Sequence, residues 1–250
     1  MSIRELLNPA GGIRYHLRAR SYRRELWQPF RMEIGEYILR WKPRESTLLL
    51  VGPSAGYCLQ PFFFERFERV VCLEPDPIAR WLFARKIAIA PLESRPRLEF
   101  ISQDHLVRFT ERLPKLVRSL GDCALLFSNV LGQIRGLLEV DDSSTPEFVR
   151  IRNAVQEATE GRAFASFHDR VSGNIRPTFA PPLTFPQRLG DAELLENLFK
   201  HARFADGERR ELLDHLTAGF FAENLPHSYF VWRLEPGRYH VIEAVNSLPR

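Results

Sequence analysis

The stretch TLLLVGPSAG, residues 47–56, decides the fold. Its first five residues are apolar or β-branched, as expected of a strand that is buried on both faces of a sheet. Gly52, Ser54 and Gly56 follow, and such small residues let a backbone turn sharply and pass close to a ligand. A strand that runs directly into a glycine-containing turn is typical of an open α/β sheet that binds a nucleotide-like ligand.

Further apolar runs follow at spacings that leave room for crossover helices. They cover residues 69–74, 97–102, 123–128 and 162–168. Strands that alternate with helices predict a parallel sheet with helices on both faces. The end of the chain differs, because residues 228–235 and 238–245 flank a Pro-Gly turn and predict an antiparallel hairpin. We therefore predict an α/β fold with a doubly wound, mostly parallel sheet of seven strands, which includes an antiparallel C-terminal hairpin.

Two helix starts carry a capping signal. Asp76 before Pro77 and Thr145 before Pro146 each combine a side chain that can accept an N–H with a proline that lacks one. Each helix should then pack an apolar stripe on the sheet. The expected stripe of the first helix is Ile78, Trp81, Leu82 and Ile89, and that of the second is Phe148, Ile151, Val155 and Ala158.

The N-terminal part differs in charge from the rest. Residues 1–44 hold ten Arg and Lys but only four Asp and Glu, whereas the whole chain has a net charge of +4. We predict a helical, Arg-rich cap at residues 1–44 and a single domain at residues 45–250. The basic surplus suits a contact with nucleic acid, and it equally suits an ordinary solvated helix face. The stretch 169–190 contains four prolines and predicts a long ordered loop.

The cysteines and the apolar runs exclude several classes of protein. The three cysteines lie among apolar residues, without the spacing of a zinc site or a disulfide framework, so we predict no metal site. The sequence also has no signal-peptide pattern and no stretch of about 18 uncharged apolar residues. We therefore expect a cytoplasmic protein without a membrane partner.

Glu74 ends the second apolar run, in the position from which a carboxylate can accept hydrogen bonds from the hydroxyls of a ribose. Together with the glycine turn, this pattern resembles the class I S-adenosylmethionine (SAM) dependent methyltransferases. Their first motif reads acidic-x-Gly-x-Gly-x-Gly, and their second strand ends in Asp or Glu. In this chain Ser54 stands at the middle glycine and Leu50 at the acidic position.

The resemblance implies SAM as the cofactor, bound by Gly52, Ser54, Gly56 and Glu74. Asp104, beyond the third apolar run, is similar to the family acid that contacts the adenine amine. Asn129 follows the fourth run, where the family often places residues that face the transferred methyl group. The terminal hairpin is similar to the antiparallel last strand that separates these enzymes from nicotinamide-binding Rossmann proteins.

The second substrate should bind where the fourth and fifth strands end, because ligands of open α/β sheets collect at that edge. His168 and Asp169 are the candidate catalytic pair, with the histidine as general base. Candidate substrate-binding residues are Tyr15, Arg18 and Arg170. His215 could fold over the same face, whereas His201, His227 and His240 have no spacing that singles them out.

These residues favour a methyltransferase that acts on an oxygen or nitrogen atom of a small molecule. Two alternatives remain at this stage. Residues 52–56 also fit the G-x-S-x-G pattern of serine hydrolases, with Ser54 as the nucleophile. Because of Leu50, the domain could instead bind a ligand without turning it over.

Overall fold

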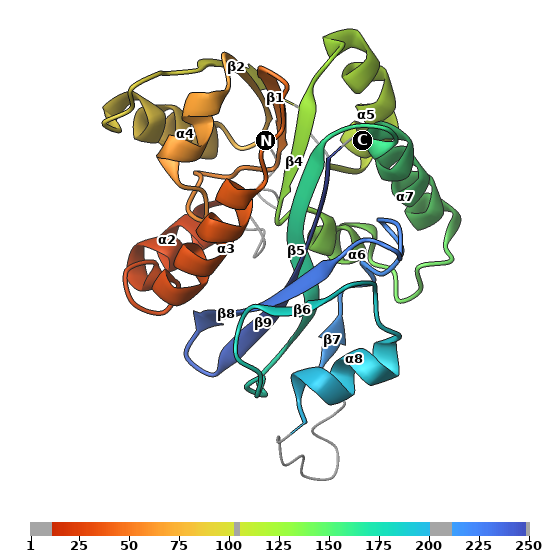
Figure 1. Cartoon of the computed structure of the whole chain (residues 1–250). Helices are drawn as coiled ribbons and strands as arrows, with labels where there is room; N and C mark the ends of the chain where they lie inside the picture. The colour runs from red at the N-terminus through yellow and green to blue at the C-terminus, as the bar shows by residue number, and fades with distance from the viewer. Residues whose placement is uncertain (1–11, 103–105, 201–211, 249–250) are drawn as a thin grey trace.

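The computed structural model describes residues 12–102, 106–200 and 212–248 (Figure 1). The elements of the first half are α2 (Gly12–Tyr22), α3 (Gln28–Arg40), β1 (Thr47–Val51), η1 (Pro61–Arg66), β2 (Arg69–Leu73), α4 (Pro77–Ile89), β3 (Arg97–Ile101), α5 (Leu106–Leu120) and β4 (Ala124–Ser128). Those of the second half are η2 (Leu131–Gln133), α6 (Ile134–Leu138), α7 (Pro146–Thr159), β5 (Phe164–Gly173), β6 (Leu183–Phe185), α8 (Asp191–Leu198), β7 (Leu213–Asp214), β8 (His227–Glu235) and β9 (Arg238–Ser247).

All strands belong to one sheet with the order β3-β2-β1-β4-β5-β9-β8-β6, and β7 pairs with β5 outside this path. β1 to β5 pair in parallel, whereas β9 runs antiparallel to both β5 and β8. The predicted α/β class, the parallel sheet and the C-terminal hairpin are thus confirmed. The predicted count of seven strands is wrong, because the sheet has nine strands within the described residues. The short strands β6 and β7 lack a continuous apolar run and add only five residues in total.

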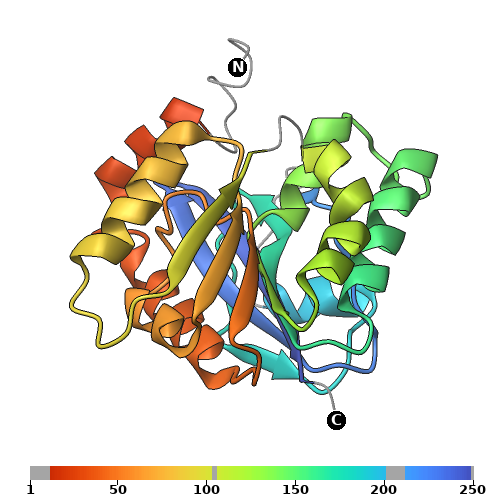
Figure 2. The same ribbon diagram turned by 90° about the horizontal axis from the view of Figure 1, so that it is seen from above.

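Helices cover both faces of the sheet, as Figure 2 shows from above. Leu48 and Leu50 of β1 face a hydrophobic cluster that includes side chains of α2, α3, η1 and α4. Leu49 and Val51 face a second cluster with side chains of α5 and α7. This alternation follows from the period of two along a strand. It explains why the strand is apolar at every position from Leu48 to Val51.

The two predicted helix starts are found, but their details differ. The Asp76 carboxylate accepts a hydrogen bond from the Ile78 N–H at 2.8 Å, as the capping signal predicts. Thr145 makes no such bond, although α7 begins at Pro146.

The apolar stripe is confirmed for α7 and wrong for α4. The four expected residues of α7 are buried. On α4, by contrast, Ala79, Phe83 and Ile87 face the sheet, while Trp81 and Ile89 are 58% and 72% exposed. Apolar residues on α4 occupy almost the whole helix circumference, so their spacing alone does not identify the buried face.

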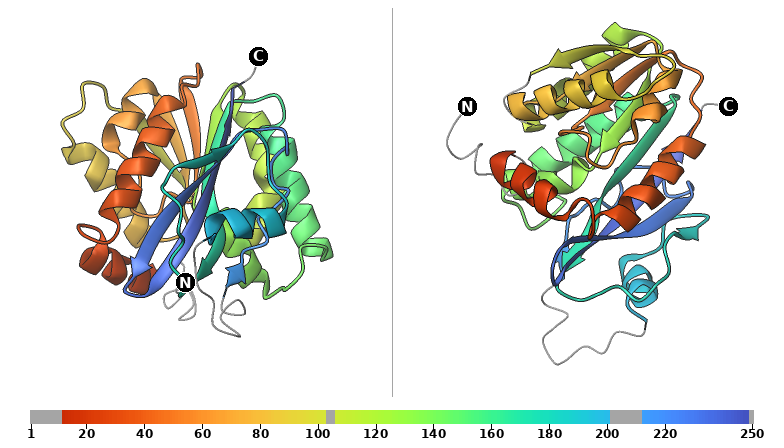
Figure 3. Two further views of the ribbon diagram at one scale, coloured as in Figure 1. Left: turned by 60° about the horizontal axis from the view of Figure 1, so that its bottom comes forward. Right: turned by 90° about the vertical axis from the view of Figure 1, so that its left-hand side faces the viewer.

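Residues 169–190 are not one long loop. β5 continues to Gly173, and β6 forms at Leu183–Phe185. The reason is the partner strand: β9 pairs with β5 from Phe164 to Gly173, whereas β4 accompanies β5 only as far as Phe167. The second half of β5 therefore projects beyond the edge where the parallel strands end. Figure 3 shows this part of the sheet with α8 packed against it.

The N-terminal helices share their core with the sheet. Trp27 donates its indole N–H to the Leu234 carbonyl at 2.8 Å, and its ring meets that of Trp232 edge-on at 5.0 Å. The Phe30 ring of α3 stacks on the Trp232 ring, with their centroids 5.1 Å apart. The predicted boundary at residue 44, between the cap and the single domain, stays a prediction.

Among the described residues, no helix combines the length and the apolar character that a membrane span requires.

A substitution at Gly56 tests the packing of the glycine turn. Gly56 has a φ of 66°, and a Cβ atom there would lie 2.6 Å from the Phe83 ring of α4. Gly161 has a similar φ of 65° but open space around it. We expect Gly161→Ala to cost about 1 kcal/mol of unfolding free energy for its backbone conformation. Gly56→Ala should cost at least about 1 kcal/mol more, because the core is overpacked. Urea unfolding of both variants measures the difference, and equal losses would contradict this packing.

Candidate functional site

A cavity of about 1280 Å³ lies at the edge of the sheet where β1 and β4 end. Its walls come from five parts of the chain: α2, the turn after β1, the segment after β4, the projecting half of β5 with the residues after β7, and the β8–β9 hairpin. Residues of these walls include Tyr15, Arg18, Gly52, Ser54, Tyr57, Asn129, Gly132, Asp169, His215, Trp232 and His240. This is the edge at which open α/β sheets bind ligands.

The turn after β1 is shaped by close contacts. Gly52 has a φ of 66°, and a Cβ atom there would lie 2.8 Å from the Val130 side chain. Ser54 also has a positive φ, 49°. Lys86 of α4 holds the far end of the turn by donating to the Gly56 and Leu59 carbonyls. The backbone of Gly52, Pro53 and Ser54 is thereby presented to the cavity, whereas Gly56 packs behind it.

Glu74 supports this turn from behind. Its carboxylate accepts the Ser54 N–H at 2.8 Å and the Asp76 N–H at 3.0 Å. The side chain is buried, and Glu74 is not among the residues that line the cavity. Burial raises the pKa of Glu74 to about 7, against the two backbone hydrogen bonds, which lower it. The ribose contact expected of Glu74 stays a prediction; in the structure its carboxylate fixes the turn.

Helix α2 lies over the turn and adds residues to the cavity wall. The His16 ring bridges the Tyr57 hydroxyl at 2.8 Å and the Asp76 carboxylate at 3.0 Å. This bridge positions Tyr15 and Arg18 at the cavity, where sequence analysis expected substrate-binding residues. Arg18 also pairs with Glu235 of the hairpin at 3.1 Å.

Asn129 and Gly132, in the segment after β4, both contact Asp169 of β5. Asn129 lines the cavity with a positive φ of 54°, and its side-chain oxygen accepts the Asp169 N–H at 3.0 Å. At Gly132 a Cβ atom would lie 2.6 Å from the Cβ of Asp169. Only glycine permits this approach, so the segment after β4 can sit directly on the projecting half of β5.

Asp169 meets two histidines in the wall of the cavity. Its carboxylate is 2.7 Å from Nδ1 of His240 on β9. Burial raises the pKa of Asp169, but His240 and then His215 lower it more, to about 2, so the group is a carboxylate at neutral pH. His215 places Nδ1 2.9 Å from the Gly132 carbonyl oxygen and Nε2 2.9 Å from the Ser172 hydroxyl. Burial lowers the pKa of His215.

One nitrogen of this cluster carries no hydrogen bond. Nε2 of His240 is buried and has no partner among the described residues. Because Nδ1 faces a carboxylate, it is the nitrogen that holds the proton in the neutral ring, and Nε2 then carries a free lone pair. His240 itself is one of the residues that line the cavity.

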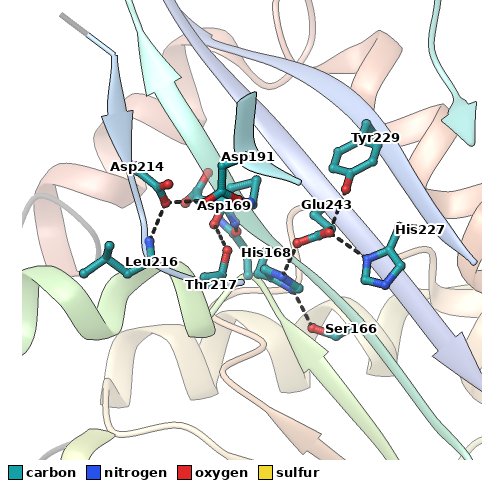
Figure 4. Close-up of polar contacts among 12 residues, drawn as sticks. Ser166, His168, Asp169, Asp191, Asp214, Leu216, Thr217, His227, Tyr229 and Glu243 are labelled. Atoms are coloured by element: carbon teal, nitrogen blue, oxygen red, sulfur yellow. Dashed lines mark hydrogen bonds and ion pairs between the residues drawn. The ribbon is translucent and has the colours of Figure 1, made fainter. Parts of the chain in front are cut away.

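The prediction that His168 pairs with Asp169 as catalytic base is not supported by its position. Figure 4 shows that His168 turns away from Asp169 toward Ser166 and Glu243, at 2.9 and 3.3 Å. It is fully buried and does not line the cavity. Neighbouring residues of a strand point to opposite faces, so only Asp169 of the pair reaches the site.

Glu243 is the centre of a separate buried network. Its carboxylate accepts from His227 at 2.7 Å and from Tyr229 at 2.9 Å, besides His168 (Figure 4). All these side chains are buried. The network ties β5, β8 and β9 together, away from the cavity.

Arg170 does not reach the cavity either. The guanidinium bonds Asp191 and Asp214, both at 2.5 Å, and its side chain is 3% exposed. Arg170 is the extra residue of a bulge between β5 and β9, so its side chain leaves the regular alternation. The expected substrate contact of Arg170 is therefore replaced by a link to α8 and β7. Asp104, the expected adenine contact, lies outside the described residues.

Sequence reasoning missed His240, Trp232 and Gly132. His240 and Trp232 lie on strands that were predicted correctly. The alternation of side chains along these strands could have shown that His240 interrupts an otherwise apolar face of the hairpin. No sequence signal shows that β9 continues along β5, and only that pairing brings His240 to Asp169. The distance of 71 residues along the chain hides the contact.

Comparisons with known proteins give fold-level likenesses only. No family model and no curated protein sequence matches the chain. Among solved structures, a DhpI complex with S-adenosylhomocysteine (SAH) is 15% identical over the whole of both chains, with a TM-score of 0.42. The N-methyltransferase NodS from Bradyrhizobium japonicum, in complex with SAH, is 13% identical over 92% of this chain and 98% of its own, with a TM-score of 0.43. A SAM-dependent methyltransferase from Anabaena variabilis is 13% identical over 88% and 83%, with a TM-score of 0.44.

Because these scores are low, the assignment of the fold rests on the sheet itself. Without β6 and β7, the sheet has the order β3-β2-β1-β4-β5-β9-β8 with β9 antiparallel to its neighbours. This is the Rossmann-like fold of class I methyltransferases, as sequence analysis predicted.

A substitution in the buried network separates its role from that of the cavity. His168 and His227 lower the pKa of Glu243 despite burial, so Glu243 stabilises the fold above its ordinary pKa and this stabilisation is lost as the pH falls below about 4.5. We expect Glu243→Gln to cost about 3 kcal/mol of unfolding free energy at pH 7 and to have a shallower loss of stability in acid.

Urea unfolding at several pH values measures both effects. Glu99→Gln is the control, because the Glu99 carboxylate forms a solvent-accessible ion pair with Arg69, and its loss should change the stability far less. A Glu243→Gln protein as stable as this control at pH 7 would contradict the role of the network.

Proposed function

We propose that this chain is a SAM-dependent methyltransferase that binds its cofactor along the turn after β1 and methylates an oxygen or nitrogen atom of a small molecule. The observation that carries the proposal is one cavity whose wall combines two different groups of residues. Gly52 to Ser54 line it, and so does the Asp169, His215 and His240 cluster. A cofactor and an acceptor can therefore meet in one cavity.

The residues around the turn after β1 fit a nucleoside with an amino-acid tail. Gly52 has no room for a side chain, so the backbone itself borders the cavity. Glu74 keeps the turn in place and retains further acceptor capacity next to it, because each carboxylate oxygen can accept more than one hydrogen bond. Tyr15, Tyr57 and Trp232 add aromatic surface, which suits a sulfonium cation. Bound SAM would supply an activated methyl group on this sulfonium.

The protein then has two tasks, to align the acceptor and to raise its nucleophilicity. Alignment comes from the walls, since β5 and β9 are paired at nine residue positions and Asn129 anchors Asp169. Nucleophilicity comes from the free lone pair of His240, which Asp169 orients. The general-base prediction is thus transferred from His168 to a cluster that includes Asp169.

The hydrolase alternative is not favoured. A serine nucleophile needs a base within hydrogen-bond reach of its hydroxyl. Within the described ranges, no histidine is hydrogen-bonded to Ser54. Its backbone N–H donates to Glu74, which serves the turn.

Calorimetric titration with SAH tests the cofactor assignment. We expect the intact chain to bind SAH at one site. Glu74→Ala removes the acceptor of two backbone N–H groups and should weaken binding by more than about tenfold, which corresponds to ~1.4 kcal/mol. Glu99→Ala is the matched control on β3 and should bind like the unchanged protein. Absence of SAH binding, or equal affinities for both variants, would contradict the proposal.

A methyl-transfer assay tests the role of the Asp169, His215 and His240 cluster. Radiolabelled SAM is incubated with the protein and a small-molecule extract, and labelled product is counted. His240→Gln should lower the transfer rate about a hundredfold or more while SAH affinity is unchanged. His227→Gln is the control, because His227 is equally buried but belongs to the Glu243 network. SAH binding without transfer to any acceptor would instead favour a ligand-binding protein without turnover.

A further inference from the structure

His240 belongs to a group of three convergent donors. Asp169, His215 and His240 each offer one ligand atom, and these atoms all lie within 4.8 Å of one another. A histidine that only removes a proton needs a single partner to orient it. The third donor, His215, is therefore unexplained by base catalysis.

His215 has the support of a metal ligand, because its Nδ1 faces the Gly132 carbonyl oxygen. Nδ1 of His240 lies 2.7 Å from the Asp169 carboxylate, so these two atoms can bind one ion in place of the hydrogen bond that joins them. A carbonyl oxygen only accepts, so Nδ1 of His215 carries the hydrogen and Nε2 carries the lone pair. The present partner of that lone pair is the Ser172 hydroxyl, which can rotate away. Histidines that bind metals almost always donate their other ring N–H to such an oxygen.

The donor set selects the kind of ion. Two imidazoles and one carboxylate suit Zn²⁺, Fe²⁺ or Co²⁺, whereas Mg²⁺ and Ca²⁺ prefer oxygen ligands alone. Ligand atoms at about 2.1 Å from such an ion lie roughly 3 to 3.5 Å from one another. Side-chain rotations that move the ligand atoms by about an ångström would therefore close the site. Three protein ligands leave coordination positions open, and all three residues line the cavity.

We propose that Asp169, His215 and His240 bind a divalent transition-metal ion, and that the methyl acceptor is a hydroxyl compound whose oxygen coordinates this ion. The second part rests on the proposed methyltransferase function. Coordination lowers the pKa of the hydroxyl, which loses its proton to water in the cavity. The oxygen electron pair then forms the new C–O bond, the S–CH₃ bond breaks with its electron pair left on sulfur, and SAH is the second product. The ion keeps its charge throughout.

Cobalt titration of tag-free, chelator-treated protein tests the metal site without cofactor or acceptor. We expect Co²⁺ to bind at one site per chain, with the visible absorption of a nitrogen- and oxygen-coordinated ion. His240→Ala and His215→Ala should each weaken binding by more than about tenfold. His240→Gln keeps the shape of the side chain and replaces the alanine variant if that one fails to fold.

His227→Ala is the matched control for cobalt binding. His227 is buried with an unpaired Nε2, as His240 is, but it lies outside the cavity. This variant should bind Co²⁺ like the unchanged protein. Absence of cobalt binding, or an equal loss in the His227 and His240 variants, would overturn the metal site.

Chelation separates this inference from the function on which it rests. Methyl transfer to a hydroxyl acceptor should disappear after treatment with a chelator and return with Zn²⁺, Fe²⁺ or Co²⁺, while SAH binding stays unchanged. Transfer that survives chelation would show that His240 acts as a bare base and would overturn the inference, but not the methyltransferase function. Failure to bind SAH with intact cobalt binding would contradict the proposed function and leave the metal site standing.

Discussion

The antiparallel pairing of β5 with β9 is the constraint on which the site depends. β4 accompanies β5 only to Phe167, but β9 continues to Gly173, so a two-stranded ribbon projects past the edge of the parallel sheet. Along this ribbon, alternation sends Asp169 to the cavity and His168 to the opposite side. The bulge at Arg170 interrupts the alternation and directs that guanidinium to α8 and β7. A cavity wall and a buried network thus arise from three consecutive residues.

Two separate sets of contacts hold the wall of the cavity. At the turn after β1, Glu74 and Lys86 bind backbone groups, and α2 closes over the turn through His16. Next to β5, Asn129 and Gly132 hold the segment after β4 against Asp169. In both sets, a side chain that sequence analysis assigned to the cofactor, Glu74 or Asn129, accepts a backbone N–H and so holds the backbone in place. This is how a site can be rigid although most of its wall is made of loops and strand ends.

Much of the fold could be predicted from the sequence, because buried parallel strands and the terminal hairpin have strong local patterns. The same holds for the turn at Gly52 and for the helix that follows Asp76. The buried face of α4 could not be predicted, since apolar residues surround that helix. The site was predicted only in part. Asp169 lines the cavity as a strand-end residue should, but its partner His240 comes from a strand whose pairing is set by tertiary contacts. Nothing local in the sequence records that register.

Hydrogen exchange of the free and SAH-bound protein, followed by mass spectrometry, tests the central claim that the cofactor lies at the carboxyl ends of β1 and β4. The account predicts that SAH slows exchange in residues 52–58 and 128–136, which form that part of the cavity wall. The β8 segment that carries Tyr229, behind the cavity, should exchange as in the free protein. Protection confined to other parts of the chain, with residues 52–58 unchanged, would contradict the account.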